Sequence, residues 1–164
     1  MKNAQQLVAL LNNKSKELGV SGTILLNRYF MEKLLERIAM SKYNSNFILK
    51  GGILISSLIG LNARTTQDID ISIKNIPLTR AKLTEVMQEV CAVNNDDGIA
   101  FAFQNITDIQ KDAEYPGLRV SFEYRFENIH NVIHIDIATG DVIVPSEIRF
   151  GLDLCQAIRH KKME

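Results

Sequence analysis

The sequence predicts a single α+β domain in which helices back one face of a small mixed sheet. The chain has 164 residues with 46% apolar residues, an ordinary globular composition. Residues 3–41 follow a helical period, whereas several later segments alternate apolar and polar residues with the period of a strand. Helices come first, and only the early strands then alternate with helices, an order that is typical of α+β domains.

Two helices are expected within residues 1–45. Leu7, Leu10 and Leu11 lie on one helical face, so residues 3–18 should form the first helix. Gly19 is a stop signal for it. Ser21 then offers an N-cap for a longer helix that reaches about residue 41. These helices are expected to be a scaffold layer rather than a chemical site.

A core of strands and helices is expected over residues 46–145. Strands are predicted by short apolar or alternating runs at residues 47–49, 68–73, 99–106, 118–126 and 131–138. Helices are predicted at residues 53–60 and 78–93, and a short C-terminal helix over residues 146–160, capped by Ser146.

Composition excludes several classes of protein. The 19 basic residues balance the 19 acidic ones, which argues against a polybasic protein that mainly holds duplex nucleic acid, although a local basic cleft stays open. The N-terminus lacks the apolar core of a signal peptide, and the longest apolar stretch, residues 51–61, is too short to span a membrane. Cys91 and Cys155 belong to no metal or redox motif. A cytoplasmic protein is therefore expected.

Acidic residues on two predicted strands are the most informative feature. Alternate side chains of a strand share a face and lie about 6.6 Å apart, so Asp68 and Asp70 should point the same way. His134 and Asp136 repeat this arrangement on a later strand. If the two strands are neighbours, three carboxylates converge, and a divalent cation such as Mg²⁺ would offset their repulsion. A solvated acidic strand face is the alternative, and a packing role and a direct role are both open for His134.

A glycine pair adds a second element to this pattern. Gly51 and Gly52 follow a predicted strand and open a predicted helix, where backbone N–H groups can approach a triphosphate without a Cβ in the way. The pair fits neither the dinucleotide-binding glycine fingerprint nor the P-loop. Glycines that open a helix, followed by paired acids on the next strand, favour phosphate chemistry assisted by two metal ions.

Three runs of residues stand out together. They are Phe47-Ile48-Leu49-Lys50-Gly51-Gly52, Arg64-x-Thr66-x-Asp68-Ile69-Asp70-Ile71, and His134-Ile135-Asp136-Ile137 with Gly140-Asp141 behind it. This combination resembles the AbiEii/AbiGii toxin branch of the DNA polymerase β-like nucleotidyltransferases. The resemblance covers about residues 16–145. It implies a minimal nucleotidyltransferase sheet flanked by helices.

The resemblance also implies roles for the acidic residues. Asp68 and Asp70 would bind the catalytic Mg²⁺, expected to be two ions. Asp136 would be the third carboxylate of the metal site and a candidate base for the acceptor hydroxyl.

Nucleotide contacts are implied in the same way. Gly51 and Gly52 would hold the NTP phosphates, with Lys50 and Arg64 as supports. Thr66 is included in the nucleotide site, although it would equally serve to order the loop before the strand. A solvated strand-end lysine is the alternative for Lys50, and a surface ion pair for Arg64.

The function implied is a toxin-like nucleotidyltransferase of a toxin–antitoxin or abortive-infection system. It would move NMP from an NTP to the hydroxyl of an RNA, including the tRNA 3′ end, or of a protein, with a cognate antitoxin as partner. Proteins of this branch usually continue into a helical C-terminal region, and here only some twenty residues follow Asp141. A non-catalytic nucleotide- or partner-binding remnant is the alternative function, and an unrelated α+β protein with an acidic strand face is the third.

Overall fold

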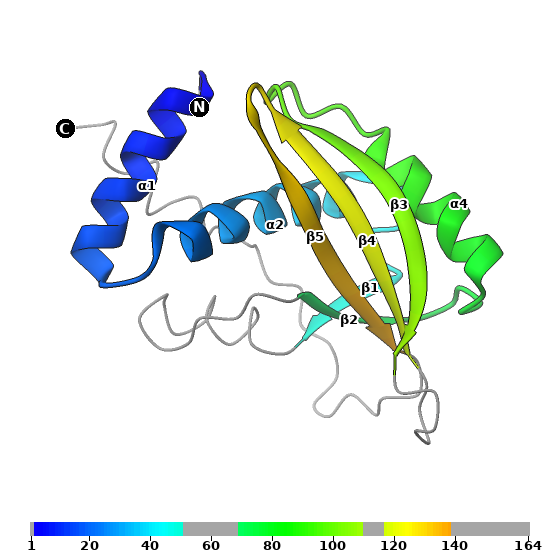
Figure 1. Ribbon diagram of the computed structural model, residues 1–164. Helices are drawn as coiled ribbons and strands as arrows, with labels where there is room; N and C mark the ends of the chain where they lie inside the picture. The colour runs from blue at the N-terminus through cyan, green and yellow to red at the C-terminus, as the bar shows by residue number, and fades with distance from the viewer. Residues whose placement is uncertain (1, 51–68, 110–116, 139–164) are drawn as a thin grey trace.

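The computed structural model describes residues 2–50, 69–109 and 117–138 (Figure 1). In chain order the elements are α1 (Ala4–Leu18), α2 (Gly22–Met40), β1 (Phe47–Lys50), β2 (Ile69–Ile73), α4 (Arg80–Cys91), β3 (Ala100–Ile109), β4 (Gly117–Phe126) and β5 (Ile129–Ala138). Each lies at a position where the sequence predicts an element of that type. The predicted helices at residues 53–60 and 146–160 lie outside the described residues.

The strands form one mixed sheet in the order β1-β2-β5-β4-β3. β2 and β5 pair in parallel, and the other neighbouring strands are antiparallel. The sheet thus brings β5, the last described strand, between β2 and β4. This confirms the predicted α+β class, with a mixed sheet.

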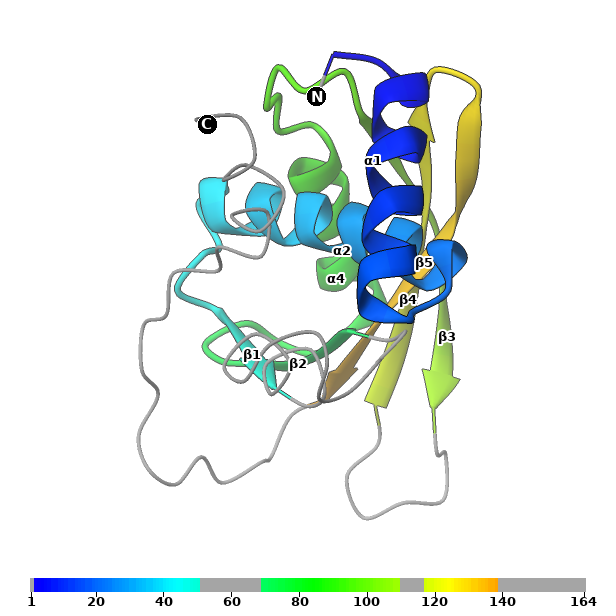
Figure 2. The same cartoon turned by 90° about the vertical axis from the view of Figure 1, so that its left-hand side faces the viewer.

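The helices α2 and α4 lie on the same side of the sheet (Figure 2). Apolar side chains of the strands face these helices and form the core. The buried ones are Ile69, Ile71, Ile73, Phe101, Leu118, Val120, Phe122, Tyr124, Phe126, Ile133, Ile135 and Ile137. The alternating strand residues point to the opposite face. The described helices therefore cover one face, as predicted, and the other face carries the polar residues of the strands.

Side-chain caps and a glycine set several of the helix ends. Asn3 caps α1 by accepting a hydrogen bond from the N–H of Gln6 (2.8 Å), and Gly19 ends it in the left-handed region at φ +65°. Thr79 caps α4 through Lys82 N–H. Ser21 stands at the N-cap of α2, as predicted, but its side chain makes no capping hydrogen bond. In the described part of the chain, no helix has the length and hydropathy that a membrane span requires.

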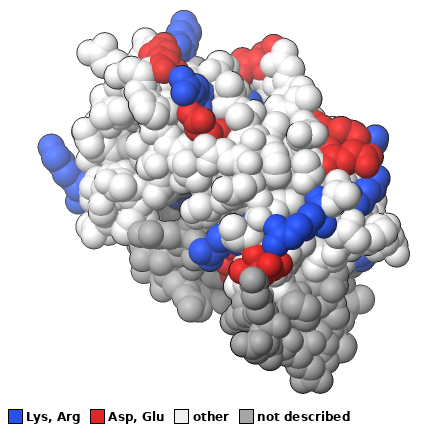
Figure 3. Space-filling view, turned by 45° about the vertical axis from the view of Figure 1, so that its right-hand side comes forward, with Lys and Arg blue, Asp and Glu red and all other residues white. Residues whose placement is uncertain are grey.

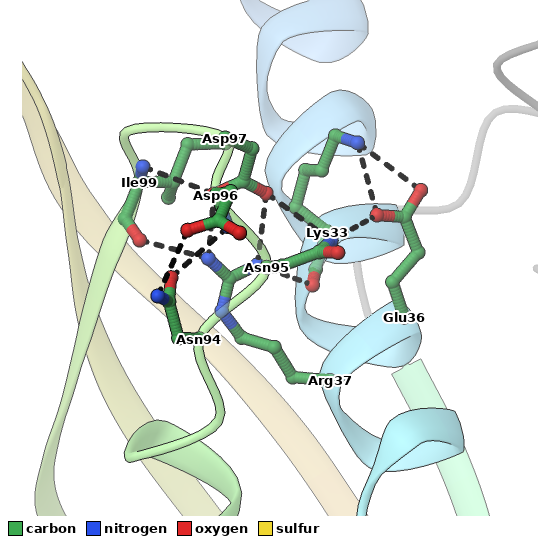
Figure 4. A network of polar contacts seen from close by, with 8 residues as sticks. All are labelled: Lys33, Glu36, Arg37, Asn94, Asn95, Asp96, Asp97 and Ile99. Atoms are coloured by element: carbon green, nitrogen blue, oxygen red, sulfur yellow. Dashed lines mark hydrogen bonds and ion pairs between the residues drawn. The ribbon is translucent and has the colours of Figure 1, made fainter.

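A buried arginine ties α2 to the connection between α4 and β3 (Figure 4). Arg37 is only 2% exposed and donates to both carboxylate oxygens of Asp97 at 2.7 and 3.1 Å. It also donates to the backbone carbonyls of Lys33 (3.0 Å) and Ile99 (2.8 Å), and its guanidinium lies 4.8 Å from the Phe101 ring centroid. The polar head of Arg37 is thus paired although the residue is buried.

An aromatic group joins α2 to β4. Phe30 stacks on Tyr124 with ring centroids 3.9 Å apart, and Phe126 lies edge-on to Phe30 at 6.4 Å. Burial raises the pKa of Tyr124, and its hydroxyl has no hydrogen-bond partner among the residues that the structure describes. A buried polar group without a partner costs about 1–3 kcal/mol.

Tyr124→Phe is therefore expected to raise the free energy of unfolding by about 1 kcal/mol, because it removes the unpartnered hydroxyl and keeps the stacked ring. Urea unfolding monitored by circular dichroism measures the change. Tyr29→Phe, which removes the hydroxyl of another buried tyrosine, on α2, is the variant for comparison. A loss of stability in Tyr124→Phe would show that the hydroxyl has a partner in solution.

Candidate active site

One row of residues crosses the outward face of four strands, β2, β5, β4 and β3. The strand register aligns Asp70 with Asp136, Asp136 with Arg119, and Arg119 with Thr107. Residues opposite one another on neighbouring strands point to the same face. The row therefore brings together residues that are far apart in the sequence, on the face opposite the helices.

The two carboxylates of the row stand on adjacent strands. Asp70 and Asp136 are register partners in the parallel pair of β2 and β5, and both are partly exposed. Neighbouring strands lie about 4.8 Å apart, so the two side chains start side by side. Like charges at such spacing repel and need a compensating positive charge. The apolar neighbours Ile69, Ile71, Ile135 and Ile137 are buried on the other face and fix this orientation.

Arg119 supplies part of that compensating charge. Its Nε donates to Asp136 Oδ1 at 2.7 Å and its Nη2 to Oδ2 at 2.8 Å, so the guanidinium engages both carboxylate oxygens. The side chain of Asp136 is 20% exposed and that of Arg119 is 38% exposed. This ion pair is a feature that sequence reasoning missed. The available signal was a charged residue on the polar side of a predicted strand, but the strand register that aligns it with Asp136 is a property of the folded sheet.

A histidine lies in the next row of the same face. His134 of β5 is the register partner of Ser121 on β4, and Ser121 Oγ lies 2.9 Å from His134 Nδ1. Ser121 is buried and His134 is partly exposed. The contact holds the imidazole against β4, on the same side as Asp136.

The structure describes only part of the predicted site. The predicted residues Asp68, Gly51, Gly52, Arg64 and Thr66 lie outside the described residues. Lys50 ends β1, and its backbone stands opposite Asp70. The residues that the structure describes hold no group of three or more His, Cys, Asp or Glu suited to a metal ion. The convergence of three carboxylates therefore remains a prediction.

The described carboxylates nevertheless suit Mg²⁺ in their chemistry. Asp70 and Asp136 offer hard oxygen donors from two rigid, adjacent strands, and Mg²⁺ is commonly bound through one or two carboxylates together with substrate phosphates. The guanidinium on Asp136 shows that this position accommodates positive charge.

Comparisons with known proteins assign the family. The family described as "Nucleotidyl transferase AbiEii toxin, Type IV TA system" matches residues 33–153, a range that contains the whole described sheet. No curated protein matches the chain.

Two solved structures from Helicobacter pylori are similar at low identity. A candidate nucleotidyltransferase from H. pylori is 18% identical with a TM-score of 0.46, over 87% of this chain and 59% of its own length. The JHP933 protein is 19% identical with a TM-score of 0.44, over 86% of this chain and 56% of its own length. The chain thus spans somewhat more than half the length of each, and the assignment rests on the family match. The chain belongs to the AbiEii toxin family of nucleotidyltransferases.

Proposed function

We propose that this protein is the toxin component of a toxin–antitoxin system and transfers a nucleoside monophosphate from an NTP to a hydroxyl group in the cytoplasm, in a reaction that requires Mg²⁺. Membership of the AbiEii family supports the reaction type. The observation that carries the proposal in this chain is the in-register pair of Asp70 and Asp136 on the polar face of the sheet.

In this proposal, the metal ligands are Asp70, Asp136 and Asp68. When bound, Mg²⁺, expected as two ions, would neutralise charge on the phosphates and on the attacking and leaving oxygens. The acceptor hydroxyl oxygen forms a bond to the α-phosphorus of the NTP while the bond from that phosphorus to the bridging oxygen breaks. Pyrophosphate leaves, and Asp136 is the candidate base that takes the hydroxyl proton.

The nucleotide phosphates are proposed to lie at the end of the row that adjoins β1. Lys50 stands opposite Asp70, and Gly51 and Gly52 follow Lys50 directly in the sequence. Backbone N–H groups of a glycine pair suit phosphate oxygens because no Cβ blocks their approach. Lys50, Arg64 and Thr66 complete the proposed nucleotide contacts.

The acceptor is proposed to be an RNA end, with the tRNA 3′ end as the leading case and a protein hydroxyl as the other. Figure 3 shows one face of the molecule, on which acidic and basic side chains lie next to one another and much of the surface is uncharged. A mixed face of this kind suits a short acceptor end better than a long duplex, whose binding depends on many basic phosphate contacts. A cognate antitoxin is the proposed protein partner.

Transfer of label from NTP tests the reaction directly. We expect that the protein, Mg²⁺ and an NTP labelled at the α-phosphate move label to total cellular RNA, and that EDTA abolishes the transfer. An NTP labelled at the γ-phosphate should leave the acceptor unlabelled, since that phosphate departs in pyrophosphate. Label from the γ-phosphate would replace the proposal with phosphoryl transfer, and label in added protein instead of RNA would change the acceptor.

A non-catalytic nucleotide- or partner-binding form is the second candidate function. The observation in its favour is that both oxygens of Asp136 are already engaged by Arg119. This candidate predicts Mg²⁺-dependent NTP binding, measurable by calorimetry, without transfer of label to any acceptor.

A further inference from the structure

We propose that Arg119 is a positioning residue of the active site that competes with the metal for Asp136. Arg119 holds both carboxylate oxygens of Asp136, and it would give up one of them when a divalent ion binds. This inference rests on the proposed function, because it takes Asp136 to be a metal ligand.

The geometry of the pair supports the positioning role. Two nitrogens of one planar guanidinium contact the two oxygens of one carboxylate, at 2.7 and 2.8 Å. This parallel arrangement fixes the carboxylate plane as well as its distance, which a single contact from an ammonium group does not do. Because β4 and β5 align Arg119 with Asp136 in the register, the backbone places both partners before any ligand arrives.

Charge explains why the pair must partly open. Asp70 and Asp136 bring two negative charges to adjacent strands, and Arg119 brings one positive charge to the same row. A divalent ion is attracted by the same carboxylate oxygens and is repelled by the guanidinium. Arg119 therefore lowers the affinity of the site for a metal ion in the absence of nucleotide.

The ion pair between Arg119 and Asp136 is weak enough for a bound metal ion to break one of its two hydrogen bonds. The Arg119 side chain is 38% exposed, and solvated ion pairs of this kind are typically worth about 0–1 kcal/mol. Giving up one of two hydrogen bonds in such a pair costs little compared with a new carboxylate–metal contact. The second hydrogen bond then keeps the Asp136 carboxylate beside Arg119.

Charge and geometry can be separated with two substitutions. Arg119→Gln removes both the positive charge and the planar guanidinium that contacts two oxygens at once. Arg119→Lys keeps the charge but loses this two-nitrogen contact. Arg125→Gln is the matched control, because Arg125 lies on the same strand and face, is 68% exposed, and pairs with Glu123. None of these substitutions removes a buried side chain, so folded proteins are expected, and thermal melting verifies this.

Binding of Mn²⁺ without nucleotide, followed by electron paramagnetic resonance, is the decisive measurement. We expect Arg119→Gln to bind Mn²⁺ about tenfold more tightly than the wild type, the order expected for removing a unit charge beside a divalent ion in a solvated site. Arg119→Lys should bind within about twofold of the wild type. Transfer of α-phosphate label should fall about tenfold in both, since both lose the planar guanidinium that orients Asp136. Arg125→Gln should match the wild type in both assays.

Asp136→Asn, measured in the same way, distinguishes failure of this inference from failure of the proposed function. If Asp136→Asn weakens Mn²⁺ binding but Arg119→Gln binds Mn²⁺ equally or more weakly than the wild type, the competition is refuted and the metal site stands. If Asp136→Asn binds Mn²⁺ as the wild type does, the proposed metal site itself is wrong and the inference falls with it.

Discussion

Asp70→Asn is expected to lower the initial rate of nucleotidyl transfer by at least about a hundredfold. The substitution keeps the size of the side chain but removes the negative charge that would bind the metal, and loss of a group that stabilises charge in a transition state commonly costs a factor of about 10²–10³. The rate is measured as transfer of α-phosphate label at saturating NTP and Mg²⁺.

Stability should respond differently from activity. Because Asp70 and Asp136 are register partners, neutralising one of them relieves repulsion between like charges. We therefore expect the free energy of unfolding of Asp70→Asn to stay within about 1 kcal/mol of the wild type. A variant that is inactive but fully folded would assign the loss to the site rather than to the fold.

Glu123→Gln is the matched control for this prediction. Glu123 lies on the same outward face, and it accepts a hydrogen bond from Arg125 at 2.9 Å, away from the row of Asp70. Its transfer rate should stay within about twofold of the wild type. Equal losses in Glu123→Gln and Asp70→Asn would show that the rate follows the general charge of this face, and full activity in Asp70→Asn would remove Asp70 from the metal site.

The strand positions and their faces could be predicted because they follow local periodicity. Alternation of isoleucine with acidic or polar residues indicates which side chains of residues 68–73 and 131–138 are buried, and the structure buries Ile71 and Ile135 as this pattern requires. The same alternation places Asp70 and Asp136 on the outward side of their strands.

Pairing between strands could not be predicted in the same way. The sequence analysis assumes that β2 and β5 are neighbours and does not predict it, because strand order depends on packing over the whole sheet. The contact between Arg119 and Asp136 depends on a third strand and on its register with β5. A shift of one residue would turn Arg119 into the core, and nothing in the local pattern of β4 specifies its partner.

The burial of Arg37 could not be predicted for a related reason. Arginine side chains are mostly exposed in folded proteins, whereas the structure buries Arg37 against Asp97, which is sixty residues away. A turn such as residues 94–98 can be predicted from its Asn, Asp and Gly residues. Its docking onto α2 is a tertiary contact that a local pattern does not contain.

Arg37→Met is expected to lower the free energy of unfolding by about 3–5 kcal/mol, the usual cost of removing one partner from a buried ion pair. Methionine fills a similar volume but leaves Asp97 without its bidentate donor and leaves the carbonyls of Lys33 and Ile99 without the guanidinium. For a domain whose total stability is about 5–15 kcal/mol, this is a large fraction. Urea unfolding measures it, and Lys82→Met, which breaks an exposed ion pair on α4, should cost less than about 0.5 kcal/mol.

The pH dependence of this loss identifies its cause. Burial raises the pKa of Asp97, but hydrogen bonds from Arg37 and from the N–H of Ile99 outweigh that effect and hold the pKa below its ordinary value. A carboxylate with a lowered pKa in the folded state stabilises the fold above its ordinary pKa of about 3.9 and loses this contribution as the pH falls through the folded value. The stability difference between wild type and Arg37→Met should therefore be constant near neutral pH and shrink below about pH 4. A difference that stays constant in acid would mean that Arg37 stabilises the fold through packing on Phe101 and its carbonyl contacts rather than through the charge of Asp97.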